Sequence, residues 1–364
     1  MFLENIYTNI IINMSKIFSS IQTIIQDAKK GKMFILVDDK NRENEGDLVI
    51  PGSKCNSKII NFMAKHGRGL ICLALSKKQI DKLKLPLMSQ INKSRMQTAF
   101  TVSIEAKRGI STGISAFDRA KTIKVAINPS SNKKDIVSPG HVFPLVSRNG
   151  GVLERAGHTE ASVDISKLSK LNPSSVICEV MNEDGRMARL NDLFRFSKRH
   201  KIKIASIADL IAYRLKNEKL VFRSKTKPIK INNISKAYFS IYKNKINTLE
   251  SFVISKGRFN KNSSIPIRVL SKQINIKNLL KDSEINENLN LLSKYKNFLL
   301  VIINSEIPKN KKNETSYTLR YYGFGAQIIK DFNVKNMILL SRSKKKIIGL
   351  EGYGLKIKKQ VIIK

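Results

Sequence analysis

Apolar residues occur along this chain in short runs that stop abruptly at polar residues, and such runs predict buried β-strands. The first run covers residues 33–37 and ends at Asp38. Ser19 or Ser20 stands where a side chain would cap an amphipathic helix before that strand. Further apolar runs at residues 176–180, 298–303, 337–340 and 347–350 indicate that strands and hydrophobic cores continue to the end of the chain.

A change of composition near Leu215 divides the 364 residues into two parts, because Lys, Asn, Ile and Ser dominate beyond it. We expect a first domain over residues 14–214 and a second over residues 215–364, after an N-terminal extension over residues 1–13. Met14 is an alternative start of translation. The apolar stretch from Phe2 to Met14 has neither the basic beginning nor the cleavage site of a signal peptide. A hydrophobic content of 41% is enough for two cores.

Acidic residues are concentrated directly after the first predicted strand, in a chain with only 28 acids against 67 bases. Ten residues hold five carboxylates: Asp38, Asp39, Glu43, Glu45 and Asp47. Like charges this close repel one another unless they face solvent or surround a cation. Carboxylate oxygens suit Mg²⁺ or Mn²⁺. A solvated acidic turn and a metal site explain this segment equally well.

Two of the four histidines have similar surroundings, in Gly140-His141 and in Gly157-His158. Both lie in a stretch, residues 140–164, with too many Gly and Pro residues for one long helix. Histidine is a common metal ligand and a proton carrier near neutral pH, whereas Arg155 and Thr159 suit a phosphate group. Each histidine alone is explained as a structural or surface residue, but the combination favours a built site.

Two further segments carry polar groups of uncertain purpose. Residues 110–123 offer hydroxyls and glycines before Asp118, and a loop that leads into a helix capped by Ser115 or Asp118 explains them without any function. Glu179 interrupts the predicted strand 176–180. It either faces solvent or acts as an acid or base, because a buried carboxylate without a partner is costly.

Four motifs, RENEGD, TGISAFDRAKTI, GHVFPL and RAGHTEASVD, occur in this order. With them, residues from about 18 to 214 resemble the 3,4-dihydroxy-2-butanone 4-phosphate synthase family of riboflavin biosynthesis. The resemblance implies conversion of D-ribulose 5-phosphate to L-3,4-dihydroxy-2-butanone 4-phosphate and formate. It also implies two Mg²⁺ or Mn²⁺ ions per active site, no organic cofactor, and a homodimer with its active sites near the subunit interface.

The resemblance assigns roles to residues that match the family pattern. It implies that Glu43 and His158 are metal ligands and that His141 and Glu179 are the proton-transfer residues, in an order that the sequence leaves open. It further implies that the substrate is bound by a larger set: Arg42, Glu43, Asp47, Arg155, Ala156, Gly157, His158, Thr159 and Glu179, with Arg155 and Thr159 facing its phosphate group.

Residues 320–340 and 349–357 resemble the end of the GTP cyclohydrolase II domain, which requires a zinc site of three cysteines. The three cysteines of this chain, Cys55, Cys72 and Cys178, all precede the second domain, and neither Cys nor His follows His200. We therefore expect a degenerate domain without zinc and without cyclohydrolase activity. The expected fold is an α/β domain, with a mixed β-sheet flanked by helices, followed by a smaller α+β cyclohydrolase II-like domain.

The net charge of +39 supports a rival hypothesis, a catalytically idle basic protein that binds RNA or acts as an interaction scaffold. The lysines are spread among Ile and Asn residues instead of forming a patch, and Trp is absent. Nucleic acid is therefore not the expected partner; an anionic sugar phosphate is. No apolar run is long enough to span a membrane, and three scattered cysteines suit the reducing cytoplasm.

Overall fold

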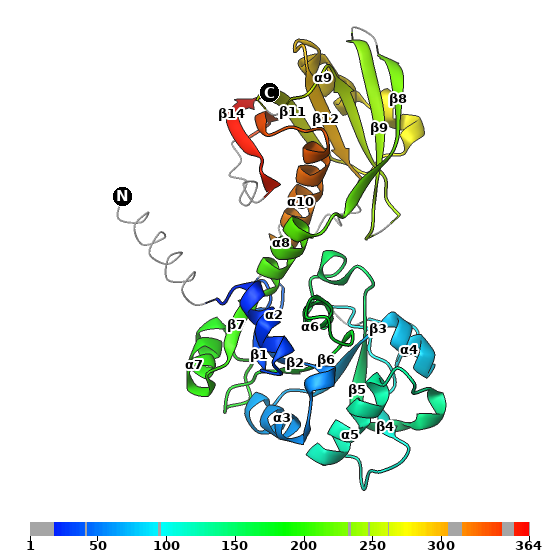
Figure 1. The fold of residues 1–364 in the computed structure, drawn as a ribbon, viewed down its shortest axis with the longest axis vertical. Helices are drawn as coiled ribbons and strands as arrows, with labels where there is room; N and C mark the ends of the chain where they lie inside the picture. The colour runs from blue at the N-terminus through cyan, green and yellow to red at the C-terminus, as the bar shows by residue number, and fades with distance from the viewer. Residues whose placement is uncertain are drawn as a thin grey trace. The chain divides into compact units, whose positions relative to one another are not determined.

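The chain forms two compact units, residues 1–211 and residues 212–364, in a computed structural model (Figure 1). The structure describes residues 18–40, 42–93, 96–231, 234–246, 248–260, 262–304, 315–343 and 353–363, without the side chains of residues 315–320. The division between the units falls within helix α8 (Ile207–Asn217), close to the change of composition near Leu215. The extension over residues 1–13 and the apolar run 347–350 lie outside the described residues.

The first unit is built on a mixed seven-stranded sheet with helices on both faces, as the sequence predicts. The strand order is β4 (Ile104–Ala106), β5 (Ile136–Ser147), β3 (Cys72–Ser76), β6 (Ser174–Glu179), β2 (Gly46–Pro51), β1 (Phe34–Val37) and β7 (Lys203–Ser206). The helices are α2 (Ile21–Lys29), α3 (Ser57–Phe62), α4 (Lys77–Leu83), α5 (Ala116–Ile127), α6 (His158–Leu168) and α7 (Leu190–His200).

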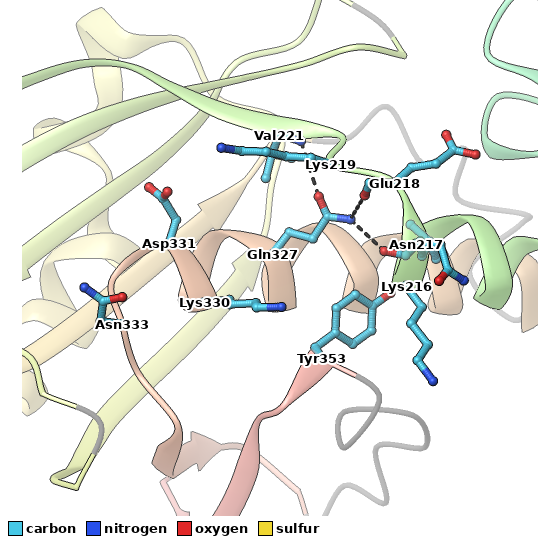
Figure 2. Close-up of a pocket in the computed structure, with 11 residues that line it drawn as sticks. Lys216, Asn217, Glu218, Lys219, Val221, Gln327, Lys330, Asp331, Asn333 and Tyr353 are labelled. Carbon is cyan, nitrogen blue, oxygen red and sulfur yellow. Dashed lines mark hydrogen bonds between the residues drawn. The ribbon is translucent and has the colours of Figure 1, made fainter.

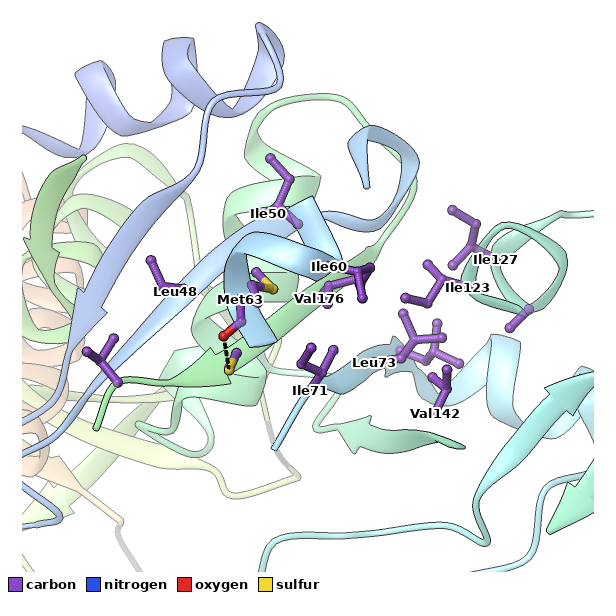
Figure 3. Packing of buried hydrophobic residues seen from close by; sticks show 14 of the residues in the cluster. Leu48, Ile50, Ile60, Met63, Ile71, Leu73, Ile123, Ile127, Val142 and Val176 are labelled. Carbon is purple, nitrogen blue, oxygen red and sulfur yellow. Dashed lines mark hydrogen bonds between the residues drawn. The ribbon is translucent and has the colours of Figure 1, made fainter. Parts of the chain in front are cut away.

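Strand alternation separates the two faces of this sheet. Leu48 and Ile50 of β2 belong to a buried cluster that includes side chains of α3 and α5 (Figure 3). Because successive strand residues point to opposite faces, Asp47 and Val49 point the other way, and α6 packs against β2. Both Asp47 and Val49 are buried. The sheet thus has one largely apolar face and one that carries a buried carboxylate beneath α6.

The local signals in the sequence place several elements correctly. Ser20 caps α2, where its hydroxyl accepts a hydrogen bond from Thr23 N. Ser115 caps α5 by accepting from Asp118 N, so Ser115 and not Asp118 is the cap. Strand β1 matches the first predicted run, and β6 covers most of the run at 176–180. In the Gly-rich stretch 140–164, β5 accounts for the beginning and α6 starts at His158.

The second unit repeats the plan of a mixed seven-stranded sheet between helices. Its order is β14 (Lys356–Ile362), β13 (Asn336–Ser341), β11 (Ser264–Ser271), β12 (Phe298–Ile303), β10 (Ser251–Lys256), β9 (Ile234–Asn244) and β8 (Val221–Ile231). Leu299, Val301 and Ile303 pack in a cluster with side chains of α10 (Thr315–Asp331). Phe298, Leu300 and Ile302 pack in a second cluster with α9 (Ser283–Ser293). The continuous apolar run 298–303 is therefore a central strand with a hydrophobic core on each side.

Gln327 of α10 joins this helix to the chain segment that enters the second sheet (Figure 2). Its side-chain oxygen accepts from Leu220 N at 2.9 Å and Val221 N at 3.4 Å. Its amide nitrogen donates to Leu215 O at 2.7 Å and Glu218 O at 2.8 Å. One amide side chain thus satisfies four backbone groups that no helix or strand ladder would serve.

We expect Gln327→Leu to destabilise the second unit by about 2 to 4 kcal/mol, because it leaves these backbone groups without partners. Urea unfolding of the full chain, with hydrogen exchange read in β10 and β12, measures the effect. Lys330→Gln on the same helix is the matched control and should cost little, because no hydrogen bond joins the Lys330 side chain to these backbone groups among the described residues. Equal stability of Gln327→Leu and wild type would contradict this account.

Candidate active site

The acidic segment folds around Asp38, the first residue after β1. Its carboxylate accepts hydrogen bonds from Glu43 N at 3.1 Å and Glu45 N at 2.9 Å. Arg42 Nη1 lies 2.8 Å from Asp38 Oδ2 and also contacts the Glu43 carboxylate. Asp38 therefore fixes the backbone of the β1–β2 loop at Glu43 and Glu45.

His158 completes the group from the first residue of α6. Its Nδ1 lies 3.7 Å from Glu43 Oε2 and 3.8 Å from Asp47 Oδ1. Asp47 on β2 stands directly opposite Glu179 on β6, so both side chains are on the face that carries α6. The structure thus brings together four of the residues that the sequence predicts for the site: Glu43, Asp47, His158 and Glu179.

The donor set fits a hard divalent cation. One ligand atom each of Asp38, Glu43 and His158 lie within 4.8 Å of one another, and this is the single such group found among the described residues. His158 Nε2 is buried and has no hydrogen-bond partner in the described part of the chain. Two carboxylates and one imidazole are ligands that Mg²⁺ and Mn²⁺ accept, whereas structural zinc prefers thiolates and several imidazoles.

Crowding of charge displaces the pKa values of these groups. Burial alone would raise the pKa of Glu43, but its ion pair with His158 and the charge of Arg42 lower it to about 2. Burial would lower the pKa of His158, but the charge of Asp47 and the ion pair with Glu43 raise it to about 9. Burial raises the pKa of Asp47 to about 8. The surrounding carboxylates therefore favour the imidazolium form of His158 at neutral pH.

The RAGHT segment runs into the N-terminus of α6, where backbone N–H groups point out of the helix. Gly157 is the residue before the helix, and a Cβ atom there would lie 2.2 Å from Arg155 Nη1. Arg155 donates to Glu160 Oε2 at 2.6 Å, Met96 O at 3.0 Å and Thr98 Oγ1 at 3.0 Å. The guanidinium is thus fixed in place beside the helix terminus by protein groups.

Glu179 is also held in position. Its Oε2 accepts a hydrogen bond from Leu70 N at 2.9 Å. A Cβ atom at Gly69 would lie 2.6 Å from that same oxygen, so glycine is what lets the backbone approach the carboxylate. Glu179 therefore does not face open solvent as an isolated strand residue; it is oriented within the group.

Within one copy of the chain, His141 is not part of the group formed by Glu43, Asp47, His158 and Glu179. Its Nδ1 bonds the carboxylate of Glu105, and its side chain is 44% exposed. Within the described residues, no hydrogen bond or ion pair connects His141 to Glu43, His158 or Glu179.

Sequence reasoning missed three carboxylates that shape this region. Asp38 was counted in the acidic cluster without a separate role, although the alternation of β1 places it on the same face as Leu36 and Asp47. Glu160 is the buried partner of Arg155, and Glu105 is the partner of His141. Glu105 is 36 residues from His141, and no local pattern in the sequence reveals that pairing.

Among the residues that the structure describes, no helix is both long and apolar enough to cross a lipid bilayer.

Residues 22–213 match the 3,4-dihydroxy-2-butanone 4-phosphate synthase family, and residues 279–362 match the GTP cyclohydrolase II family. The chain is 41% identical to the riboflavin biosynthesis protein RibBA of Aquifex aeolicus, over 95% of this chain and 93% of that protein. It is also 41% identical to the 3,4-dihydroxy-2-butanone 4-phosphate synthase of Photobacterium phosphoreum, over 93% of this chain and 98% of that protein.

Solved structures agree with these relationships. The crystal structure of RibBX, a two-domain 3,4-dihydroxy-2-butanone 4-phosphate synthase from A. baumannii, matches with a TM-score of 0.83 at 38% identity and covers 95% of this chain and 100% of that one. A 3,4-dihydroxy-2-butanone 4-phosphate synthase in complex with two magnesium ions matches with a TM-score of 0.53 at 36% identity, over 55% of this chain and 98% of that one. The chain therefore belongs to the 3,4-dihydroxy-2-butanone 4-phosphate synthase family, with a second domain related to GTP cyclohydrolase II.

Proposed function

We propose that the first unit converts D-ribulose 5-phosphate to L-3,4-dihydroxy-2-butanone 4-phosphate and formate, in riboflavin biosynthesis. The observation that carries this proposal is the group of Asp38, Glu43 and His158, whose ligand atoms lie within 4.8 Å of one another, with Glu179 and Asp47 beside it. Membership of the synthase family supports the same reaction. The free state of all three cysteines is consistent with a cytoplasmic enzyme.

Glu43 and His158 are the proposed ligands of the divalent cation, Mg²⁺ or Mn²⁺, and Asp38 orients Glu43 through the closed loop. A synthase structure with two magnesium ions supports two ions per site. Bound there, divalent cations would stabilise the oxyanions that arise when the ketose is enolised and formate leaves. No organic cofactor and no zinc take part in this proposal.

The remaining side chains bind the substrate and move protons. Glu179, fixed by Leu70 N, takes or returns a proton beside the cation, and His141 is the second proton carrier. The phosphate group lies at the N-terminus of α6, next to Thr159 and Arg155. Arg42 and Asp47 contact the sugar phosphate from the β1–β2 side.

We expect Glu43→Gln and His158→Asn to lower turnover by more than about 100-fold, because each loses a ligand worth several kcal/mol of transition-state stabilisation. Both should also weaken Mg²⁺ binding measured by calorimetry. Glu45→Gln is the matched control, since Glu45 lies in the same loop, its backbone N–H bonds Asp38, and its side chain contacts only Arg189, at 3.7 Å, among the described residues. Normal Mg²⁺ binding and turnover in Glu43→Gln would show that the cation site lies elsewhere.

For the second unit we propose a retained fold without GTP cyclohydrolase II activity. Support comes from the sequence, where no Cys or His follows His200, so the thiolate and imidazole ligands of zinc are missing.

The purified chain should consume no GTP when zinc is added, and its zinc content should return to background after dialysis. The chromatographic assay for GTP is run beside the formate assay on the same sample, so that inactive protein is recognised. GTP consumption that a chelator abolishes would overturn the proposal.

We further propose that the enzyme is a homodimer in which His141 of one copy serves the cation site of the other. His141 is partly exposed and has no bond to that site within its own chain. The exposed apolar side chains Ile114, Phe117 and Val137 belong to the same unit and would be covered by a partner.

Hybrid dimers test this arrangement. If Glu43→Gln and His141→Asn chains are inactive alone, random mixing should restore about a quarter of wild-type activity, because each hybrid keeps one intact site. Glu43→Gln mixed with His158→Asn is the control and should stay inactive, since both residues belong to one copy. No recovery in the first mixture, with dimers present in sedimentation, would place His141 in the site of its own chain.

A further inference from the structure

We propose that Glu105 is the positioning residue of His141: it fixes the imidazole as the Nδ1–H tautomer, so that Nε2 is the atom that exchanges protons with the substrate. This inference rests on the proposed function of His141. The carboxylate of Glu105 contacts His141 Nδ1. It has no other hydrogen-bond or ion-pair partner among the described residues. An ionised carboxylate only accepts, so Nδ1 must donate.

The backbone is distorted at the place where this contact forms. Along the β4–β5 pair, Ile104 stands opposite Val142, but the next residue, Glu105, stands opposite Val137. One step along β4 therefore corresponds to five steps along β5, and residues 138–141 are left outside the ladder. This bulge carries His141 out of the regular sheet pattern and aims its ring at Glu105.

Hydrogen bonds and glycines hold the bulge against β4. Ser138 Oγ donates to Ser103 O at 2.7 Å, and Gly140 N donates to Ser103 Oγ at 3.0 Å. A Cβ atom at Gly140 would lie 2.2 Å from the carbonyl carbon of Ile104 and 2.4 Å from Cγ of Glu105. Only glycine lets the bulge lie this close to the Glu105 side chain.

A second segment covers the carboxylate of Glu105. Gly113 has φ +90°, and a Cβ atom there would lie 1.7 Å from Glu105 Oε1. Asp118 fixes this loop by accepting from Ser111 N and Gly113 N, each at 3.1 Å. The carboxylate is therefore shielded, with 15% side-chain exposure, while the imidazole is 44% exposed. Within this pair, the Glu105 carboxylate is largely shielded and the His141 imidazole is accessible.

This arrangement has the chemical consequence of a carboxylate behind a catalytic imidazole. The carboxylate keeps the ring orientation and the tautomer, and it stabilises the imidazolium that forms when Nε2 takes a proton. A second interpretation is that Glu105 only fastens the bulge. The two interpretations differ in what happens to turnover when the charge is removed but the shape is kept.

Glu105→Gln keeps the shape of the side chain and removes its charge. We expect it to lower kcat by about 10- to 100-fold and to leave KM within about twofold, because substrate binding does not involve Glu105. In a chain that already carries His141→Asn, the same change should not lower the residual turnover further, as a residue that acts only through His141 requires. Asp135→Asn is the control, because the Asp135 carboxylate accepts from Asn132 N in the short helical turn before β5 and does not touch His141.

The tautomer of the His141 ring can be measured independently of enzyme turnover. Nitrogen-15 NMR of full-length protein, with the His141 signals assigned by their loss in His141→Asn, should show Nδ1 protonated in the neutral ring. Glu105→Gln should move the population toward the Nε2–H form. An unchanged tautomer with unchanged kcat in Glu105→Gln would overturn the proposal. If wild type released no formate but showed the tautomer shift, the positioning would stand and the proposed reaction would fail.

Discussion

Repulsion among buried carboxylates is the constraint on which the first unit depends. The buried Asp38 and Asp47 and the half-buried Glu43 lie together with His158 where β1 ends and β2 begins, and burial there penalises their charged forms. Two backbone N–H groups and the Arg42 guanidinium offset part of that cost, and the imidazolium of His158 offsets another part. A divalent cation at this place would offset far more than either. The same carboxylates that are costly to bury would therefore bind the cation that the proposed synthase chemistry requires.

The sheet supplies the geometry that makes this crowding specific. Strand alternation directs Leu48 and Ile50 into the apolar core beneath α3 and α5, and it directs Asp47 to the face that receives α6. The antiparallel register then sets Glu179 across from Asp47. The second unit has a similar layering of helices and sheet. Because its sequence offers neither thiolates nor imidazoles, we propose that its relationship to GTP cyclohydrolase II does not extend to the zinc chemistry.

Local patterns in the sequence were sufficient for much of the fold and of the candidate site. Short apolar runs located β1 and β12, and serine caps located the starts of α2 and α5. The acidic segment and the family motifs led to Glu43 and His158. Long-range pairings were beyond such reasoning. Arg155 with Met96 O and Thr98 Oγ1, and Glu105 with His141 across a bulge of β5, exist only once the chain has folded. The start of α6 inside a Gly-rich stretch was hidden for a related reason, because the helix begins just after the last glycine of that stretch.

We propose that this carboxylate–imidazole group works as a divalent-cation site for sugar-phosphate chemistry. The most direct measurement is formate release from D-ribulose 5-phosphate by the purified full chain, first with Mg²⁺, then with EDTA, and then with Mg²⁺ restored in excess. Formate release should begin with Mg²⁺, stop with EDTA and resume when the ion is restored. Folded protein that releases no formate with Mg²⁺ or Mn²⁺, or that releases it equally in EDTA, would contradict this proposal.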